Sequence, residues 1–475
     1  MQKPYAQMSL TDTYADVCKT SEENKSEFLL MLEEHINFNK FIPIEFHWAF
    51  NQRIGRPREY FLESFVRFSV LQKILGIPLD STMLNLLDIS HELREFCGFE
   101  KVPDTSLITR FRQDFVHYLE KMFDKLVEIT EPICREIDEK KADYLIYDPT
   151  GIEANVRENN PKFLNGILNQ CKKQAKKNPN INPYSLAYSQ MPETAKANPF
   201  VKQQYINGHF CYAHKVGILT NGLGVVRHIS FFDESFKHRH PEVISKKTDN
   251  PELDKEIGDS VSLKPVLSDF FKVHPTFSYK TFLGDSSFDT YDTYTMLRDE
   301  FHFDRMAIPL NNRNTSRKHT DADDNGNPIC PVDKTPFIYA GPCNGKNRSK
   351  RFKWVCSKSY KIPGTSKRFL ICKTPCTESP YGRCSYTYPD KNLRLCPGIP
   401  RGTEHWDNLY RHRVLVERTI NTLKDPLGVS FRKSYSQRTA KADILFAGIT
   451  QLIGVILAHA INKPHLYKSI RKLIS

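Results

Sequence analysis

The chain has 475 residues, of which 39% are hydrophobic and 26% are charged, and it carries a net charge of +13 at pH 7. This length is sufficient for two or three domains with at least one large core, and the basic charge favours a polyanionic partner. The first 25 residues contain no apolar run of signal-peptide length, which argues against secretion and predicts a cytoplasmic protein. In that compartment we expect the 12 cysteines to be thiols or metal ligands rather than a disulfide framework.

Residues 1–135 are predicted to form an N-terminal helical domain. Apolar residues are closely spaced in the run EYFLESFVRFSVLQKILGI, which has a glycine near its end and is followed by Pro78. Farther along, the segment Pro103 to Ser106 supplies capping residues for a helix that carries Arg110 and Arg112 near its start. Short helices with a basic start are typical of a helix-turn-helix-like DNA-binding domain, in which these arginines contact phosphates. An ordinary helical domain explains the pattern equally well.

Residues 136–312 and 398–475 are predicted to form an α/β domain. The run DYLIYD is a short apolar strand that delivers Asp148, and the run TFLGD leads in the same way into Asp285. Between them, Asn221-Gly222 separates two apolar runs, which is a hairpin signal. The order of strand, hairpin, helix, strand, helix and strand predicts a mixed sheet flanked by helices.

Two polar segments interrupt this pattern. The first, Asn159 to Gln204, is rich in Asn, Lys, Gln and Pro and is predicted to be a long excursion. The second, 313–397, is predicted to be a basic insertion with 7 of the 12 cysteines; the stretch 311–400 has 17 Lys and Arg against 6 Asp and Glu, a net charge of +11. That charge favours contact with a DNA backbone.

The cysteines of this insertion leave two interpretations open. Strong zinc ribbons show two tight CxxC knuckles, and none is present here, so buried free thiols explain the cysteines at least as well as a structural zinc site. A zinc site would use some of four residues: Cys356, Cys372, Cys376 and Cys384.

The segment from Ala442 to Ile461 is the one stretch that is apolar enough to be considered as a membrane span. It contains Asp443, Gln451 and His459, and these polar residues favour a helix buried in a protein core. The sequence therefore predicts no membrane partner.

The stretch DNLYRHRVLVERTINTLKDPL, from Asp407 to Leu427, is predicted to be one amphipathic helix with Asp407 as its N-cap and Pro426 and Gly428 at its end. Four polar residues at offsets of 0, 3, 7 and 14 fall at roughly 0°, 300°, 340° and 320° around the helix axis, a strip about 60° wide. These residues are Tyr410, Arg413, Glu417 and Lys424.

The basic residues of this strip suit an anionic ligand. Arg413 is expected to contact phosphates bidentately and Lys424 as a point charge. Tyr410 is expected to orient a phosphate or a water, or simply to pack. Mixed charges at these spacings are also typical of an ion-paired, solvated helix face, and the helix alone does not decide between the two.

Asp148, Asp285 and Glu417 are the residues that the sequence predicts to act together. Carboxylate oxygens are the ligands that Mg²⁺ (or Mn²⁺) prefers. Two such ions roughly 3.5–4 Å apart activate a nucleophile and stabilise the leaving oxygen in phosphodiester cleavage. Taken singly, each aspartate after a strand is explained better by a turn or a helix cap, so the prediction depends on their occurring together.

The spacing Tyr410-x2-Arg413-x3-Glu417-x6-Lys424 resembles the signature of a large group of bacterial insertion-sequence transposases with DDE chemistry. Other stretches resemble the two aspartate blocks and the N-terminal helices of that group: DPTGIEANV, GDSSFDT, GRPREYFLESFVRF and PDTSLITRFRQ. The resemblance spans most of the chain and implies a ribonuclease H-like catalytic core that depends on Mg²⁺. It also implies that the protein binds double-stranded DNA, at terminal inverted repeats and at a target, and performs cleavage and strand transfer in a synaptic assembly.

One feature departs from the simplest form of this pattern. The interval between Asp285 and Glu417 is long because the basic, cysteine-bearing segment lies within it. Members of the group often carry an insertion at this place, so the triad stands, while the role of the insertion stays open.

The resemblance therefore predicts a transposase and endonuclease of the bacterial cytoplasm, associated with the nucleoid. Two alternatives remain. One is a nuclease or recombinase with the same core, and the other is a domesticated, non-catalytic protein that only binds DNA. The presence of all three carboxylates favours an enzyme.

Overall fold

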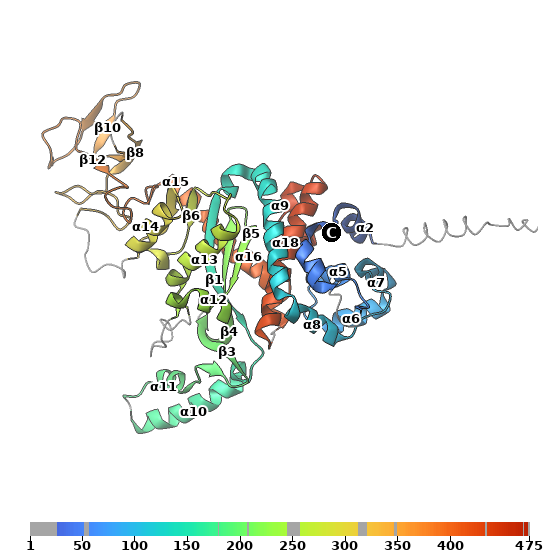
Figure 1. The fold of residues 1–475 in the computed structure, drawn as a ribbon. Coiled ribbons are helices and arrows are strands. Elements are labelled where there is room, and N and C mark those ends of the chain that lie inside the picture. Colours follow the sequence, from blue (N-terminus) through green and yellow to red (C-terminus); the bar gives the residue numbers. More distant parts are fainter. Residues whose placement is uncertain are drawn as a thin grey trace, which may run out of the picture. The chain divides into compact units, whose positions relative to one another are not determined.

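A computed structural model describes the chain over residues 26–51, 57–178, 180–206, 209–244, 257–311, 321–345, 349–432, 435–468 and 470–473. The chain divides into two compact units (Figure 1). The helical unit comprises Met1–Ile133, Leu423–Arg432 and Arg438–Ser475, and the sheet unit comprises Cys134–Thr422 and Lys433–Gln437.

Short helices, capped by local side chains, build the N-terminal part of the helical unit. Ser90 and Asp104 accept hydrogen bonds from backbone N–H groups in the first turn of the helices that follow them. Gly76 and Gly98 end two of the short helices at φ of +67° and +71°, a left-handed conformation that favours glycine. The helices are α2 (Glu27–His35), α3 (Phe38–Phe41), α4 (Ile44–Phe50), α5 (Leu62–Leu75), α6 (Asp80–Ile89), α7 (His91–Cys97), α8 (Thr105–Asp114) and the start of α9 (Val116–Ala142). The predicted helical character of this region is confirmed.

The helical unit also contains the C-terminal segment, which the sequence analysis assigned to the α/β domain. This segment contributes α17 (Val429–Arg432) and most of α18 (Gln437–Ala460). Within the described residues, α18 is the one helix that is long and apolar enough to cross a membrane, and 89% of its apolar window is buried. This agrees with the predicted core helix. Asp443 of α18 pairs with Lys73 of α5 at 2.5 Å, a contact between distant segments that sequence periodicity does not reveal.

A seven-stranded mixed sheet forms the centre of the sheet unit, as predicted. Its strand order is β2-β3-β4-β1-β6-β7, and β5 pairs with β4 off this path. β1 runs antiparallel to β4 and parallel to β6, which in turn runs parallel to β7. The strands are β1 (Tyr144–Glu153), β2 (Thr194–Ala195), β3 (Asn198–Ile206), β4 (His209–Asn221), β5 (Val226–Phe231), β6 (Thr281–Leu283) and β7 (Arg305–Ala307). The predicted hairpin at Asn221-Gly222 joins β4 to β5.

Helices pack against this sheet through an apolar core. Leu145 and Phe282, from the central strands, are fully buried together with Leu267 and Leu297 of two helices. A hydrogen bond of 2.7 Å between the hydroxyls of Tyr147 and Ser262 also joins β1 to α13. The helices of this region are α12 (Glu234–Arg239), α13 (Asp259–Val273), α14 (Tyr291–Asp299), α15 (Glu404–Tyr410) and α16 (Val414–Lys424), whose last two residues are grouped with the helical unit.

Two smaller structures lie in the predicted polar segments. The excursion folds as α10 (Pro161–Lys177) and α11 (Pro183–Gln190), followed by β2 and β3. The cysteine-bearing segment forms a three-stranded sheet of β8 (Ile338–Pro342), β9 (Phe352–Val355) and β12 (Cys384–Thr387), with a two-stranded sheet of β10 (Ser359–Lys361) and β11 (Arg368–Leu370). Short strands and turns were expected in this second segment, whereas the helical pair α10–α11 was not.

Candidate active site

Strand register places the first two predicted carboxylates side by side. In the parallel pair of β1 and β6, Ile146 lies opposite Leu283. Asp148 is two residues beyond Ile146, and Asp285 is two residues beyond Leu283. Because side chains in a strand repeat with a period of two, the two aspartates take corresponding positions on the same face. Asp148 lies within β1, which continues past the predicted strand end to Glu153, whereas Asp285 follows the end of β6.

Local bonds orient Asp285. Its carboxylate caps the 3₁₀ turn Ser286–Phe288, accepting a hydrogen bond of 2.8 Å from the Ser287 backbone N–H and another from the Ser287 hydroxyl. The preceding Gly284 has no room for a side chain, because a Cβ there would lie 2.9 Å from the ring of Phe288. Ser287 was not among the predicted site residues, although it lies in the motif GDSSFDT, two residues after Asp285.

The helix that carries Glu417 differs from the predicted one. It begins at Glu404 instead of Asp407, because Thr403 is the N-cap and accepts a hydrogen bond of 3.2 Å from the Trp406 N–H. It then tightens into a 3₁₀ turn at Arg411–Arg413 before α16 begins. The break lies inside the predicted strip, yet Arg413 and Glu417 remain one turn apart and pair with each other.

Arg413 contacts all three predicted carboxylates. Its Nη2 lies 3.4 Å from Asp148 Oδ1 and 3.9 Å from Asp285 Oδ2, and its Nη1 pairs with Glu417 Oε1. The three acidic side chains are 20%, 39% and 46% exposed, respectively, and that of Arg413 is 17% exposed. Residues separated by more than 260 positions are thereby gathered in one solvent-accessible cluster, which we call the carboxylate cluster.

The carboxylate cluster is electrostatically unbalanced. Three carboxylates surround one guanidinium, so the group carries a net charge of −2 when all four side chains are ionised. Tyr410 lies beside it, stacked on Trp406 with ring centroids 5.6 Å apart. Burial raises the pKa of Tyr410 above its usual value, and the negative charges of Asp285 and Asp148 add to this effect against the opposing influence of Arg413. The phenol is therefore a protonated hydrogen-bond donor at neutral pH.

No metal-binding arrangement is formed by the side chains alone. Among the described residues, no three His, Cys, Asp or Glu side chains are placed so that they could hold a metal ion together. In the carboxylate cluster, the guanidinium of Arg413 lies where the three acidic side chains meet. The predicted magnesium sites at Asp148, Asp285 and Glu417 therefore stay a prediction.

The predicted phosphate contacts outside the carboxylate cluster have different surroundings. Arg110 is exposed on α8, where its guanidinium donates to the backbone carbonyl and the hydroxyl of Ser106, each at 3.4 Å. Arg112 is fully buried and donates to Asp80 and Gln72, so this burial argues against the predicted contact with phosphate. Lys424, the last residue of α16, is half-buried and is grouped with the helical unit.

The four predicted zinc ligands are only partly brought together. Cys356 is buried in a small core with Cys330, Phe337 and Trp354, and Cys376 packs against that core. The thiol of Cys376 interacts with the thiol of Cys330, which was not among the four predicted ligands, and both cysteines are free. The other two predicted ligands are Cys372, 3.9 Å from Lys358 Nζ, and Cys384, which is exposed. Zinc binding stays a prediction that metal analysis of the purified protein checks.

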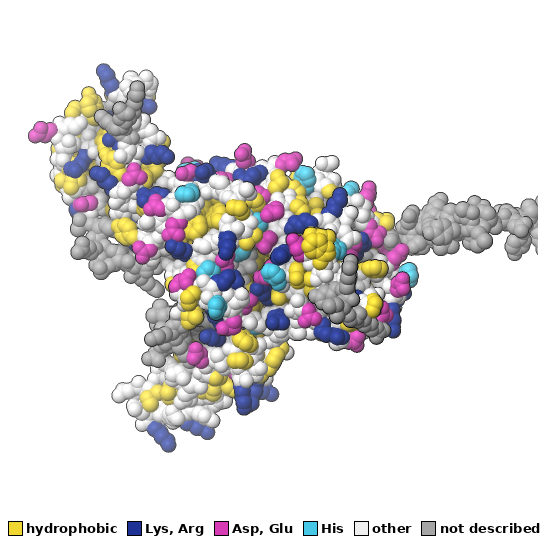
Figure 2. Space-filling model, viewed as in Figure 1, with side chains coloured by type: hydrophobic (Ala, Val, Ile, Leu, Met, Phe, Trp, Pro, Cys, Tyr) yellow, Lys and Arg dark blue, Asp and Glu magenta, His cyan; other side chains and the backbone are white. Residues whose placement is uncertain are grey.

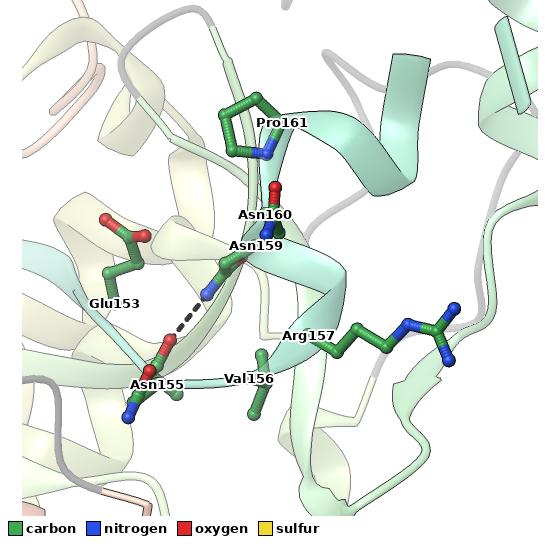
Figure 3. Close-up of a pocket in the computed structure, with 8 residues that line it drawn as sticks. Glu153, Asn155, Val156, Arg157, Asn159, Asn160 and Pro161 are labelled. Carbon is green, nitrogen blue, oxygen red and sulfur yellow. Dashed lines mark hydrogen bonds between the residues drawn. The ribbon is translucent and has the colours of Figure 1, made fainter. Parts of the chain in front are cut away.

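A pocket of about 450 Å³ lies where β1 gives way to α10 (Figure 3). The amide of Asn159 holds its wall, donating to the carbonyl oxygens of Ala154 at 2.7 Å and Tyr212 at 2.8 Å. Glu153 and Arg157 point to opposite sides of the pocket. The Asn159 amide is bonded to backbone carbonyls, and Glu153 and Arg157 point apart, so these polar groups do not converge on a ligand. This pocket is therefore not the candidate active site.

Comparison with known proteins supports one functional class. Residues 17–114, which include α2 to α8, match the family model described as "Transposase domain (DUF772)". No curated protein matches the chain. Among solved structures, the chain is similar to a piggyBac transposase synaptic complex with hairpin DNA, determined by cryo-EM, with 11% identity and a TM-score of 0.38 over 95% of this chain and 80% of that one. This likeness is too distant to carry an inference, whereas the family match supports a DNA transposase.

Proposed function

We propose that this protein is a DDE transposase that cleaves DNA at the ends of an insertion sequence and transfers the cut strand to target DNA. The observation that carries the proposal is the contact of Arg413 with Asp148, Asp285 and Glu417. Strand ends and helix spacing in the sequence predict the same three carboxylates. The transposase family match over 17–114 supports the same class independently.

The topology of the sheet unit supports a ribonuclease H-like core. β1 is central, with the antiparallel strands β4 and β5 on one side and the parallel strands β6 and β7 on the other. The carboxylates lie on β1, directly after β6 and on the helix α16. This placement is the one that the resemblance to insertion-sequence transposases implies.

The residues of the carboxylate cluster fit divalent cations in their chemistry. Carboxylate oxygens are hard ligands, and the net charge of −2 is what one divalent cation neutralises. Asp148, Asp285 and Glu417 would hold the ions, two Mg²⁺ or Mn²⁺ in our proposal. When bound, such ions activate a nucleophilic water or hydroxyl and stabilise the leaving oxygen of a phosphodiester.

The other side chains have roles of their own. Ser287 holds the Asp285 carboxylate in one orientation through two hydrogen bonds. Arg413 keeps the mutually repelling carboxylates together and presents a planar donor to a phosphate. Tyr410, kept protonated, donates a hydrogen bond to a phosphate oxygen or to a water. Lys424 remains a proposed phosphate contact.

The proposed partners are double-stranded DNA and further copies of the chain. The DNA comprises the terminal inverted repeats of the element and the target, and the copies associate with both in a synaptic complex. We place this reaction in the bacterial cytoplasm, at the nucleoid. A nuclease or recombinase with the same core, and a non-catalytic DNA-binding protein, are the alternatives.

Cleavage of the DNA that flanks the coding region tests the proposal. With Mg²⁺ present, we expect the wild-type protein to cut the element ends and to join them to a second DNA. Asp148→Asn, Asp285→Asn and Glu417→Gln should each lower the cleavage rate by about 10²–10³-fold or more, since each removes a carboxylate ligand of the cations that stabilise the transition state in our proposal. Binding of the same DNA should persist in all three variants.

The control is Asp292→Asn, which removes an exposed carboxylate of α14 outside the carboxylate cluster and should leave the rate unchanged. Cleavage without joining would favour the nuclease alternative. Binding without any cleavage by the wild-type protein would favour the non-catalytic alternative.

A further inference from the structure

The helical pair α10–α11, which we call the basic lobe, has an unusual charge content. Residues 161–190 contain five lysines and no Asp or Glu. All five lysines are exposed, and they lie on α10: Lys162, Lys172, Lys173, Lys176 and Lys177. Figure 2 shows Lys and Arg side chains at the outer end of this lobe.

The lysines occupy one side of α10. At 100° per residue, they fall within an arc of about 140° around the helix axis, and Phe163, Ile167 and Cys171 fall on the opposite side. From Lys162 to Lys177 the basic side is about 22 Å long, at 1.5 Å per residue. Four of the five charges therefore cluster at the end of α10, and Lys162 lies on the same side of the helix about 15 Å away, at 1.5 Å per residue. We call this side of α10 the lysine edge.

The apolar side fixes this edge to the sheet unit. Phe163, Leu164 and Ile167 pack against a buried cluster that includes Val201 of β3 and Tyr212 of β4. The buried Cys171 thiol lies 3.4 Å from Gln190 Oε1 and so links α10 to α11. The lobe is thus anchored to β3 and β4, and β4 pairs with β1.

Within the described residues, no acidic side chain neutralises this edge. None of the five lysines forms an ion pair there, and Lys172 lies 5.7 Å from the ring centroid of Tyr184 in the same lobe. Like charges held one turn apart, such as Lys172 and Lys176, repel each other. A helix that keeps this arrangement on an anchored surface is suited to a polyanion.

The basic lobe lies beyond the carboxyl end of β1. Asp148 is in the middle of this strand, which continues for five residues to Glu153 and then leads into α10. At about 3.3 Å per residue, the strand carries the chain roughly 17 Å from Asp148 to Glu153, and residues 154–160 then lead into α10. That distance corresponds to about five base-pair steps of duplex DNA at 3.4 Å each.

We propose that the basic lobe binds the phosphate backbone of the duplex next to the bond that the carboxylate cluster cleaves. This inference rests on the proposed function for the position of the cleaved bond. The lysines contact the phosphates of the duplex beyond that bond, on the side of the sheet unit where β1 ends. Lysine ammonium groups contact phosphates as point charges and lack the planar geometry that reads base edges. This contact therefore does not depend on the DNA sequence.

Salt dependence of DNA binding tests this proposal with the full chain. The probe is a random-sequence duplex about three helical turns long, and its affinity is measured by fluorescence anisotropy from about 50 to 200 mM KCl. In the variant K172A/K173A/K176A/K177A, we expect the log–log slope to become shallower by about two to four, because each lost phosphate contact removes about 0.9. The matched variant K172R/K173R/K176R/K177R keeps all four charges and should retain the wild-type slope.

Other outcomes overturn the proposal. An unchanged slope in the alanine variant, with the wild-type melting curve, shows that the lobe does not contact DNA. An unchanged slope together with loss of self-association in sedimentation assigns the lobe to an acidic face of a second copy instead. The assay requires no cleavage, so a protein that binds through the lobe but never cuts DNA refutes the proposed function and leaves this contact standing.

Discussion

Each of the two units contains a cluster in which arginine meets several carboxylates, and the two clusters differ in burial and in charge balance. In the sheet unit, Arg413 contacts three partly exposed carboxylates whose group charge is −2. In the helical unit, a largely buried network joins two carboxylates to three cations, with a group charge of +1 when all are ionised. Its members are Lys73, Asp80, Arg112, Arg432 and Asp443.

The carboxylate of Asp80 has several hydrogen-bond donors in the buried network. Asp80 accepts from Arg112 at 2.7 Å, from Arg432 at 2.6 Å and from Gln72 at 3.0 Å. These arginines hold the pKa of Asp80 well below its usual range despite its burial. The buried network is largely closed to solvent, whereas the carboxylate cluster has both solvent access and excess negative charge. The difference indicates that the buried network stabilises the fold, and it supports our proposal that the carboxylate cluster binds cations.

The largest effect on stability is expected from Asp80→Ala. The substitution leaves Arg112 and Arg432 buried without their shared partner, and breaking a buried pair in this way costs about 3–5 kcal/mol. Urea unfolding measures the loss. Glu63→Ala, which removes the partly exposed partner of Arg67, is the control and should cost less than about 1 kcal/mol. Equal losses in the two variants would contradict the structural role of the network.

Arg413→Ala should lower the cleavage rate strongly and the stability only slightly, in contrast to the large loss of stability expected from Asp80→Ala. We expect cleavage to fall by about 10²-fold, because a positioned charge at the reacting centre is lost. The free energy of unfolding should change by less than about 1 kcal/mol, because the pairs of Arg413 are partly exposed. Arg413→Lys keeps the charge without the planar fork and should recover part of the rate. A strong loss of stability with normal cleavage would make Arg413 a structural residue like Arg432.

A smaller, pH-dependent effect is expected from Lys73. Burial lowers the pKa of Lys73 from 10.5 to about 8, against the opposing attraction of Asp443. Between these two values the unfolded chain binds more protons than the folded one, so stability rises with pH across this window and falls as pH drops through 8. Lys73→Met should remove this contribution, seen as a smaller gain in melting temperature from pH 7.5 to pH 9.5. In Lys101→Met, which alters an exposed lysine of the same unit, the full gain should remain.

Much of the candidate site was predictable from sequence because its residues follow local rules. Asp148 and Asp285 come at or directly after apolar strands, and Arg413 and Glu417 are one helical turn apart. What the sequence did not contain was the register of β1 against β6, which decides whether the two aspartates meet. Register depends on tertiary packing, so the contact of Arg413 with all three carboxylates was visible only in the structure.

Other predictions failed where burial overrides local pattern. Arg112 looked like a basic residue near the start of a helix, but its buried partner Asp80 lies 32 positions earlier, beyond any local spacing rule. The sequence after Leu423 does not indicate which of the two units this segment belongs to, because an apolar helix can pack in the core of either unit. Cys330 stands far from Cys376 in sequence, so the spacing of the cysteines did not reveal their interaction, and zinc binding stays a prediction.

Binding of Mn²⁺ to the full chain, measured by calorimetry with duplex DNA present, tests most directly whether the three carboxylates form one cation site. The account predicts that Asp148→Asn, Asp285→Asn and Glu417→Gln each weaken Mn²⁺ binding by at least about tenfold. The exposed control Asp292→Asn should bind Mn²⁺ as the wild-type protein does. Unchanged Mn²⁺ binding in the triple variant of Asp148, Asp285 and Glu417 would contradict the account.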